Sequence, residues 1–192
     1  MPSEKTPPSP SIMTKRVLCL LVPGFEEIET VTPVDLLRRA GAEVVIASLD
    51  GEQSVTGRCD VTLEADARLD DVINDDFDLL FLPGGPGVKV LRSDGRPAQL
   101  AKQFAGSDKY IGAICAAPTV LADAGLLAGK RFTAHFSVHA ELTDALGEER
   151  VVEDGTLITS RGAGTAVEFG LALVKRLFGE AKANEVAASI MF

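Results

Sequence analysis

The chain has 192 residues, of which 46% are hydrophobic, and this length and composition allow one well-filled core. Its formal net charge of −9 at pH 7 disfavours a nucleic-acid backbone or an anionic membrane as the main partner. No run approaches the roughly 18 apolar residues that are needed to span a bilayer. The cysteines Cys19, Cys59 and Cys115 are too scattered for a disulfide framework or a zinc site, so we expect a cytoplasmic protein without a metal.

The beginning of the chain differs in composition from the rest. Residues 1–14 hold four of the ten prolines together with serine and threonine, and such a segment cannot bury enough apolar area to become ordered. We therefore predict a flexible tail over residues 1–14 and a single domain over residues 15–192. The tail lacks a continuous apolar stretch, so we do not expect a secretory signal.

The first fifty residues predict a β-α-β unit. Residues 16–22 are apolar after Arg16, which is typical of a central parallel strand, and Cys19 would lie in the core. An acidic loop that contains Glu29 follows, and then a helix that ends at Gly41. Residues 44–49 predict the second strand, which would pair in parallel with the first.

A glycine-rich stretch follows the third predicted strand. Residues 54–63 predict a hairpin that leaves the main sheet, and residues 69–73 predict one helical turn. Residues 77–82 form the next buried strand, and residues 83–87, PGGPG, come directly after it. Backbone amides in such a loop can approach a ligand closely. The stretch fits neither the dinucleotide fingerprint nor the phosphate-loop pattern, so it does not favour a nucleotide cofactor.

Cys115 lies where a strand gives way to a helix. A helix is expected over residues 97–104, a strand over residues 110–114, and another helix from Pro118. At the start of a helix, unpaired amides and the positive end of the dipole would lower the pKa of the thiol. Small neighbours such as Ala116 leave room for a nucleophile elbow with a substrate above it. The alternative is that Cys115 is simply a small buried hydrophobic residue.

The last third of the chain alternates strands and helices as well. We expect a strand over residues 130–134, a short helix over residues 138–146, a hairpin over residues 151–160, and helices over residues 165–178 and 180–190. Alternating strands and helices around buried apolar runs indicate a layered α/β fold. The acidic loop, the glycine-rich stretch and the cysteine turn would then meet at the carboxyl edge of one parallel sheet.

Five stretches of the sequence resemble the ThiJ/PfpI superfamily in the order that is typical of it. They are GFEEIETVTPVDLLRRAG (24–41), DLLFLPGGPG (78–87), AICAAPTVLADAGLL (113–127), RFTAH (131–135) and VVEDGTLITSRGAGTAVEFGLALV (151–174). The resemblance implies a flavodoxin-like fold, also called class I glutamine amidotransferase-like, which is a three-layer sandwich with a mostly parallel central sheet. The sequence is similar to the branch that contains the parkinsonism-associated protein, to which glyoxalase and deglycase activities are attributed.

The resemblance implies that Cys115 is the nucleophile and that Glu29 is the carboxyl group hydrogen-bonded to it. A carboxyl beside a thiolate forms a like-charge pair, so Glu29 would stay protonated and donate to the sulfur. The alternative is that Glu26, Glu27 and Glu29 merely stabilise a helix N-terminus.

Four further site residues follow from the same resemblance. His135 matches the histidine that the family places near the cysteine, and it acts either as a base or by shaping the pocket. The backbone amides of Gly85 and Ala116, with Gly84 beside them, would form an oxyanion hole.

The implied activity is that of a cofactor-independent glyoxalase III or deglycase, acting on methylglyoxal-type 2-oxoaldehydes or on their early protein and nucleotide adducts. A second hypothesis is a redox-sensing or chaperone-like protein that works through oxidation of Cys115. A cysteine peptidase ranks last, because it needs a Cys-His-acid relay for which the sequence gives no clear evidence. The resemblance also implies a homodimer.

Overall fold

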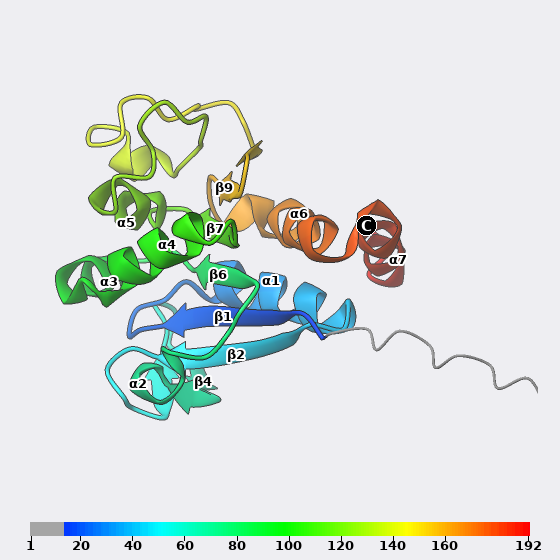
Figure 1. The fold of residues 1–192 in the computed structure, drawn as a ribbon, viewed down its shortest axis with the longest axis horizontal. Coiled ribbons are helices and arrows are strands. Elements are labelled where there is room, and N and C mark those ends of the chain that lie inside the picture. The colour runs from blue at the N-terminus through cyan, green and yellow to red at the C-terminus, as the bar shows by residue number, and fades with distance from the viewer. Residues whose placement is uncertain (1–13) are drawn as a thin grey trace, which may run out of the picture.

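The computed structural model describes residues 14–192, so the predicted tail lies outside the described residues except for Thr14. A seven-stranded sheet with the order β5-β2-β1-β6-β7-β9-β8 forms the centre of the fold (Figure 1). The strands are β1 (Arg16–Leu21), β2 (Glu43–Ser48), β5 (Ala67–Arg68), β6 (Leu79–Leu82), β7 (Tyr110–Ile114), β8 (Val151–Asp154) and β9 (Leu157–Ser160). All pairings in this sheet are parallel except that of β8 with β9.

Helices cover both faces of this sheet (Figure 1). One face carries α1 (Glu27–Arg39), α6 (Ala166–Phe178) and α7 (Glu180–Ser189), and the other carries α2 (Leu69–Val72), α3 (Val88–Asp94), α4 (Arg96–Gly106) and α5 (Pro118–Asp123). In β1, Val17 and Cys19 pack with the first set and Leu18 and Leu20 with the second, because successive side chains of a strand point to opposite faces. This arrangement confirms the predicted three-layer, flavodoxin-like sandwich.

The strand order places a switch point at β1, which pairs with β2 on one side and with β6 on the other. The chain therefore leaves β1 and β6 toward helices on opposite faces, and open α/β sheets bind ligands in the crevice that this creates. The predicted excursion also forms, as a two-stranded hairpin of β3 (Ser54–Thr56) and β4 (Thr62–Glu64). The Gly24 amide donates to the carbonyl of Thr56 over 2.9 Å, which ties the hairpin to the loop after β1.

Two predicted elements are wrong, and both lie between α5 and β8. Residues 130–134 form no strand, because β8 already pairs with the edge of β9 and the Thr133 amide donates instead to the Thr159 hydroxyl over 3.0 Å. Residues 138–146 form turns after a short 3₁₀ helix at Phe136–Val138. The Leu146 amide donates back to the carbonyl of Phe132, so the segment is organised by long-range bonds rather than by a helical ladder.

Helix α3 was not expected, and it follows the glycine-rich loop directly. Across residues 14–192, no helix combines the length and the apolar character that crossing a membrane would require.

Candidate active site

Cys115 occupies a sharp turn between the end of β7 and the start of α5, as predicted. Its φ is 66°, in the left-handed region that non-glycine residues rarely adopt. The turn is fixed on both sides, because the Cys115 amide donates to the Ser160 carbonyl over 2.8 Å and its carbonyl accepts from the His135 amide over 2.8 Å. Such a conformation persists only where the surroundings impose it, and it directs the side chain toward the carboxyl edge of the sheet.

Glu29 lies in the first turn of α1, not in a loop as predicted. Glu26 caps this helix, and its Oε2 accepts the Glu29 amide over 2.7 Å. Glu29 is 2% exposed, and its Oε2 has no hydrogen-bond partner among residues 14–192. Helix capping therefore accounts for Glu26, whereas the buried Glu29 carboxyl faces the sulfur.

Gly84 makes room for this pair of side chains. A Cβ atom at position 84 would overlap both the Glu29 Oε2 and the Cβ of Cys115, and it would lie 3.0 Å from the Ile114 carbonyl oxygen. Gly85 has a φ of 98°, and a Cβ there would lie 2.6 Å from the Glu26 amide nitrogen. The loop after β6 can therefore lie against the cysteine and the helix start only because both positions are glycine.

The thiol and the carboxyl interact strongly. Burial raises the pKa of Glu29 to about 7. Burial and the negative charge of Glu29 raise the pKa of Cys115 to about 12, although the backbone amides of Gly85 and Ala116 act in the opposite direction by donating to the sulfur. The predicted lowering of the thiol pKa by a helix start is therefore wrong, because α5 has six residues and its dipole competes with burial and a carboxyl group. Between these two pKa values the pair holds one proton.

The rate at which iodoacetamide alkylates Cys115 is therefore expected to rise with a midpoint near pH 7. Below this pH both Cys115 and Glu29 are protonated. Above it the pair has lost one proton, and it exists either as a thiol beside a carboxylate or as a reactive thiolate beside a protonated Glu29. In Glu29→Gln the thiol stays buried without a partner that can take its proton, so the midpoint should move to higher pH. Mass spectrometry in a Cys59→Ser background measures the rate, and a midpoint above pH 9 that Glu29→Gln leaves unchanged would contradict proton sharing.

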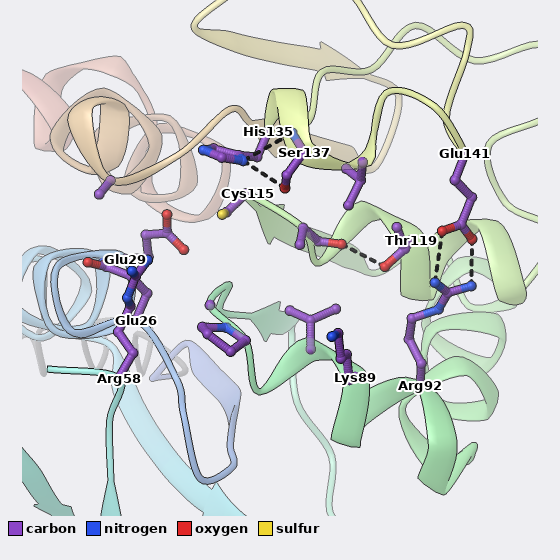
Figure 2. Close-up of a pocket in the computed structure, with 16 residues that line it drawn as sticks. Glu26, Glu29, Arg58, Lys89, Arg92, Cys115, Thr119, His135, Ser137 and Glu141 are labelled. Atoms are coloured by element: carbon purple, nitrogen blue, oxygen red, sulfur yellow. Dashed lines mark hydrogen bonds and ion pairs between the residues drawn. The ribbon is translucent and has the colours of Figure 1, made fainter. Parts of the chain in front are cut away.

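Cys115 is 9% exposed and lies at the wall of a cavity of about 550 Å³ (Figure 2). Figure 2 shows Glu26, Glu29 and Arg58 on one side of this cavity and Arg92 with Glu141 at the other end. The cavity is large enough for a small carbonyl compound, and Cys115 belongs to its lining.

His135 lines the same cavity and is half-buried. Its Nδ1 is 2.8 Å from the Ser137 hydroxyl, and burial lowers its pKa. No hydrogen bond joins its side chain to Cys115 or to a carboxylate anywhere in residues 14–192. The structure therefore brings the predicted residues Cys115, Glu29, His135, Gly84, Gly85 and Ala116 together, but it does not form a Cys-His-acid relay.

Sequence reasoning missed the far rim of the cavity. Lys89 and Arg92 belong to α3, which was not predicted, and Arg92 binds Asp123 over 2.7 Å and Glu141 over 2.6 Å. These two ion pairs attach the irregular segment that carries His135 to α3 and α5. The available signal was the pair of basic residues Lys89 and Arg92, three positions apart after the glycine-rich stretch, but such a pair is too common to indicate a site.

Among residues 14–192, no three histidine, cysteine or acidic side chains lie close enough together to hold a metal ion. The site offers a buried thiol, a carboxyl group with a raised pKa, and backbone amides that donate to the sulfur.

Known proteins are similar to this chain in sequence and in fold. The chain is 40% identical over 183 residues to Protein dj-1beta of Drosophila melanogaster, and the alignment covers 93% of this chain and 98% of that protein. The crystal structure of Drosophila melanogaster DJ-1beta matches this chain with a TM-score of 0.90. Oxidized DJ-1 of Toxoplasma gondii is 35% identical, with a TM-score of 0.89, over 93% of this chain and 99% of that one. The Parkinson disease protein 7 homolog of Danio rerio is 37% identical over 183 residues, 92% of this chain and 97% of that protein. Residues 15–176 match the model of the DJ-1/PfpI family, and the chain belongs to this family.

Proposed function

We propose that this chain is a cofactor-independent glyoxalase III or deglycase, which converts methylglyoxal-type 2-oxoaldehydes or their early adducts to hydroxy acids. The observation that carries the proposal is the pair of Cys115 and Glu29 in a cavity, where burial raises the pKa of the carboxyl to about 7. A carboxyl with that pKa can both give and take a proton at neutral pH.

The reaction can be written with these two side chains. The Cys115 thiolate adds to the aldehyde carbon, and the carbonyl oxygen takes the proton of Glu29, which gives a hemithioacetal. The Glu29 carboxylate then removes the hydrogen from that carbon and returns the proton to the adjacent carbon through an enediol. The resulting thioester is cleaved by water, which releases lactate and restores the thiol. The aldehyde carbon is oxidised and the ketone carbon is reduced, so the electrons balance within the substrate.

The other groups have supporting roles in this proposal. The amides of Gly85 and Ala116 donate to the sulfur and favour the thiolate. In this proposal they would also stabilise an oxyanion on the attacked carbon. His135, whose pKa is lowered by burial, would act as a neutral group that orients the substrate or assists the water.

The test is the loss of methylglyoxal and the formation of lactate by the wild-type protein and by Cys115→Ser. We expect turnover by the wild type and a loss of about 1,000-fold or more in the variant, because a serine hydroxyl is a far weaker nucleophile than a thiolate. Wild-type turnover equal to that of buffer would exclude the enzymatic proposal.

A second candidate function is redox sensing, which the environment of the sulfur favours. The amide groups and the Glu29 carboxyl that surround Cys115 could hold the oxygens of a sulfinic acid. Absence of turnover together with the addition of oxygen by peroxide at Cys115 alone would select this function. A peptidase has less support, because His135 has no carboxylate partner among residues 14–192.

The homodimer stays a prediction. Ile28 and Val31 on α1 are 54% and 44% exposed, and they offer an apolar surface beside the β3-β4 hairpin for such a contact.

A further inference from the structure

A second cavity, of about 410 Å³, shares His135 and Ala163 with the cavity of Cys115. We call it the arginine chamber, because Arg150 and Arg161 line it together with His135 and His139. No carboxylate belongs to its lining in the part of the chain that the structure describes, although the chain as a whole has a net charge of −9.

The two arginines differ in how their charges are compensated. Arg150 binds the Glu168 carboxylate, with Nε 2.8 Å from Oε1, and it also donates to the Gly164 carbonyl over 2.8 Å. Arg161 is half-buried and donates only weakly, over 3.5 and 3.4 Å, to the carbonyls of Gly147 and Glu148. It forms no ion pair with any residue in the range 14–192. A partly desolvated guanidinium without a counter-ion favours an anion that can approach it.

His135 lines both cavities. Burial lowers the pKa of His135, and the charges of His139 and Arg58 lower it further. Arg58 lines the Cys115 cavity and, like Arg161, forms no ion pair among residues 14–192. Arg58 and Arg161 would each attract an anion, and the arginine chamber suits an anion better because the carboxyl groups of Glu26, Glu29 and Glu141 line the Cys115 cavity.

Phe136 gives the arginine chamber an apolar wall. Its side chain is 77% exposed, and its ring centroid lies 4.2 Å from that of His135. A ligand with a short apolar stem and an anionic end therefore matches the chamber better than an ion without a stem.

We propose that the arginine chamber binds a carboxylate or phosphate group on the thiol part of a hemithioacetal substrate. The C–S bond of the adduct breaks, the departing thiol takes the proton of the hydroxyl group, and Cys115 adds to the aldehyde carbon that this step restores. The two cavities adjoin at His135 and Ala163, so the proposal requires a substrate that extends past these residues from Cys115 to Arg161. The inference rests on the proposed function and narrows it: adducts that carry an acidic group are the preferred substrates, rather than the free, uncharged aldehyde.

The test uses three hemithioacetals of methylglyoxal, made with 2-mercaptoethanol, 3-mercaptopropionate and 2-mercaptoethyl phosphate. The thiols differ mainly in the terminal group, and an excess of thiol keeps the aldehyde in the adduct. We expect wild-type kcat/KM, measured as lactate formation, to be about tenfold or more higher for the acidic adducts, since a charge-assisted hydrogen bond has this effect. The ratio of kcat/KM for the carboxylate adduct to kcat/KM for the phosphate adduct shows which of the two groups the chamber prefers.

Arg161→Gln should remove this preference, so that the three adducts have equal kcat/KM. Arg131→Gln is the matched control, because Arg131 is exposed and belongs to neither cavity, and it should behave like the wild type. Equal wild-type rates for all three adducts, or a preference that survives in Arg161→Gln, would overturn the proposal.

Direct binding separates this proposal from the proposed function. If the wild type converts none of the adducts, titration calorimetry with inorganic phosphate still decides on the chamber. Binding that Arg161→Gln abolishes would retain an anion site there, and no binding would exclude it. Phosphate binding together with equal rates for the three adducts would assign the site to a free anion and reject the role in substrate selection.

Discussion

Replacing Gly84 with alanine is expected to lower kcat/KM for methylglyoxal by about 100-fold or more. The added Cβ would overlap both the Glu29 Oε2 and the Cβ of Cys115, so the two side chains must move apart. Displacement of a reacting group by about 1 Å can reduce a rate to this extent. The free energy of unfolding should also fall by about 1–3 kcal/mol, because the atoms around position 84 are already in contact.

Gly106→Ala is the matched control for Gly84→Ala. Gly106 lies in the last turn of α4, and a Cβ there would meet no atom within 4 Å. This variant should keep full activity and equal or higher stability in urea, because alanine favours a helix more than glycine does. If Gly84→Ala kept wild-type activity and iodoacetamide reactivity, Cys115 and Glu29 would not need their observed contact.

Replacing Glu29 with glutamine is the second change with a large expected effect, a loss in kcat/KM of about 100-fold to 10,000-fold. Glutamine keeps the size of the side chain but cannot transfer a proton, and positioned proton transfer contributes a factor of this order. The pH dependence should change as well. Wild-type activity should rise as the pH increases through about 7, where the Glu29–Cys115 pair loses its first proton, and this rise should be absent in Glu29→Gln.

Glu27→Gln controls for the loss of a negative charge from the same helical turn. Glu27 lies in the first turn of α1, and its Oε1 accepts the Cys59 amide over 2.7 Å, a contact that glutamine can keep. Steady-state rates from pH 5 to pH 9 should match those of the wild type. An equal loss of activity in both variants would show that only the charge at the helix start matters.

The apolar runs of the sequence were sufficient to predict the central strands. Residues 16–22, 77–82 and 110–114 are mostly apolar, as expected of strands that are covered on both faces, and this pattern is recognisable without tertiary information. The segment before β8 could not be predicted in the same way. Its Thr133 amide bonds to the Thr159 side chain and its Leu146 amide to the Phe132 carbonyl, and such contacts leave no local pattern.

The candidate site was predictable where a residue directly follows a strand. Cys115 and Gly84 each come within two residues of the end of a strand, so their convergence at one sheet edge follows from parallel pairing. Glu29 was expected in a loop and lies in a helix, because the Glu26 side chain caps α1 earlier than the sequence pattern indicated. Arg92 and Arg161 were missed, because their environments depend on segments that are distant in the sequence.

The sequence by itself determined the order of strands and helices, and with it the edge of the sheet at which a thiol, an acid and a glycine loop meet. Only the tertiary structure decided the protonation of that thiol. A local pattern reports the start of a helix, which lowers a thiol pKa, but it does not report burial or a carboxyl group 86 positions earlier in the chain, at Glu29, next to Cys115. Burial and the Glu29 carboxyl both raise the pKa of Cys115, and the exclusion of solvent strengthens the interaction between Glu29 and Cys115. Together they outweigh the lowering of the pKa by the six-residue helix that follows.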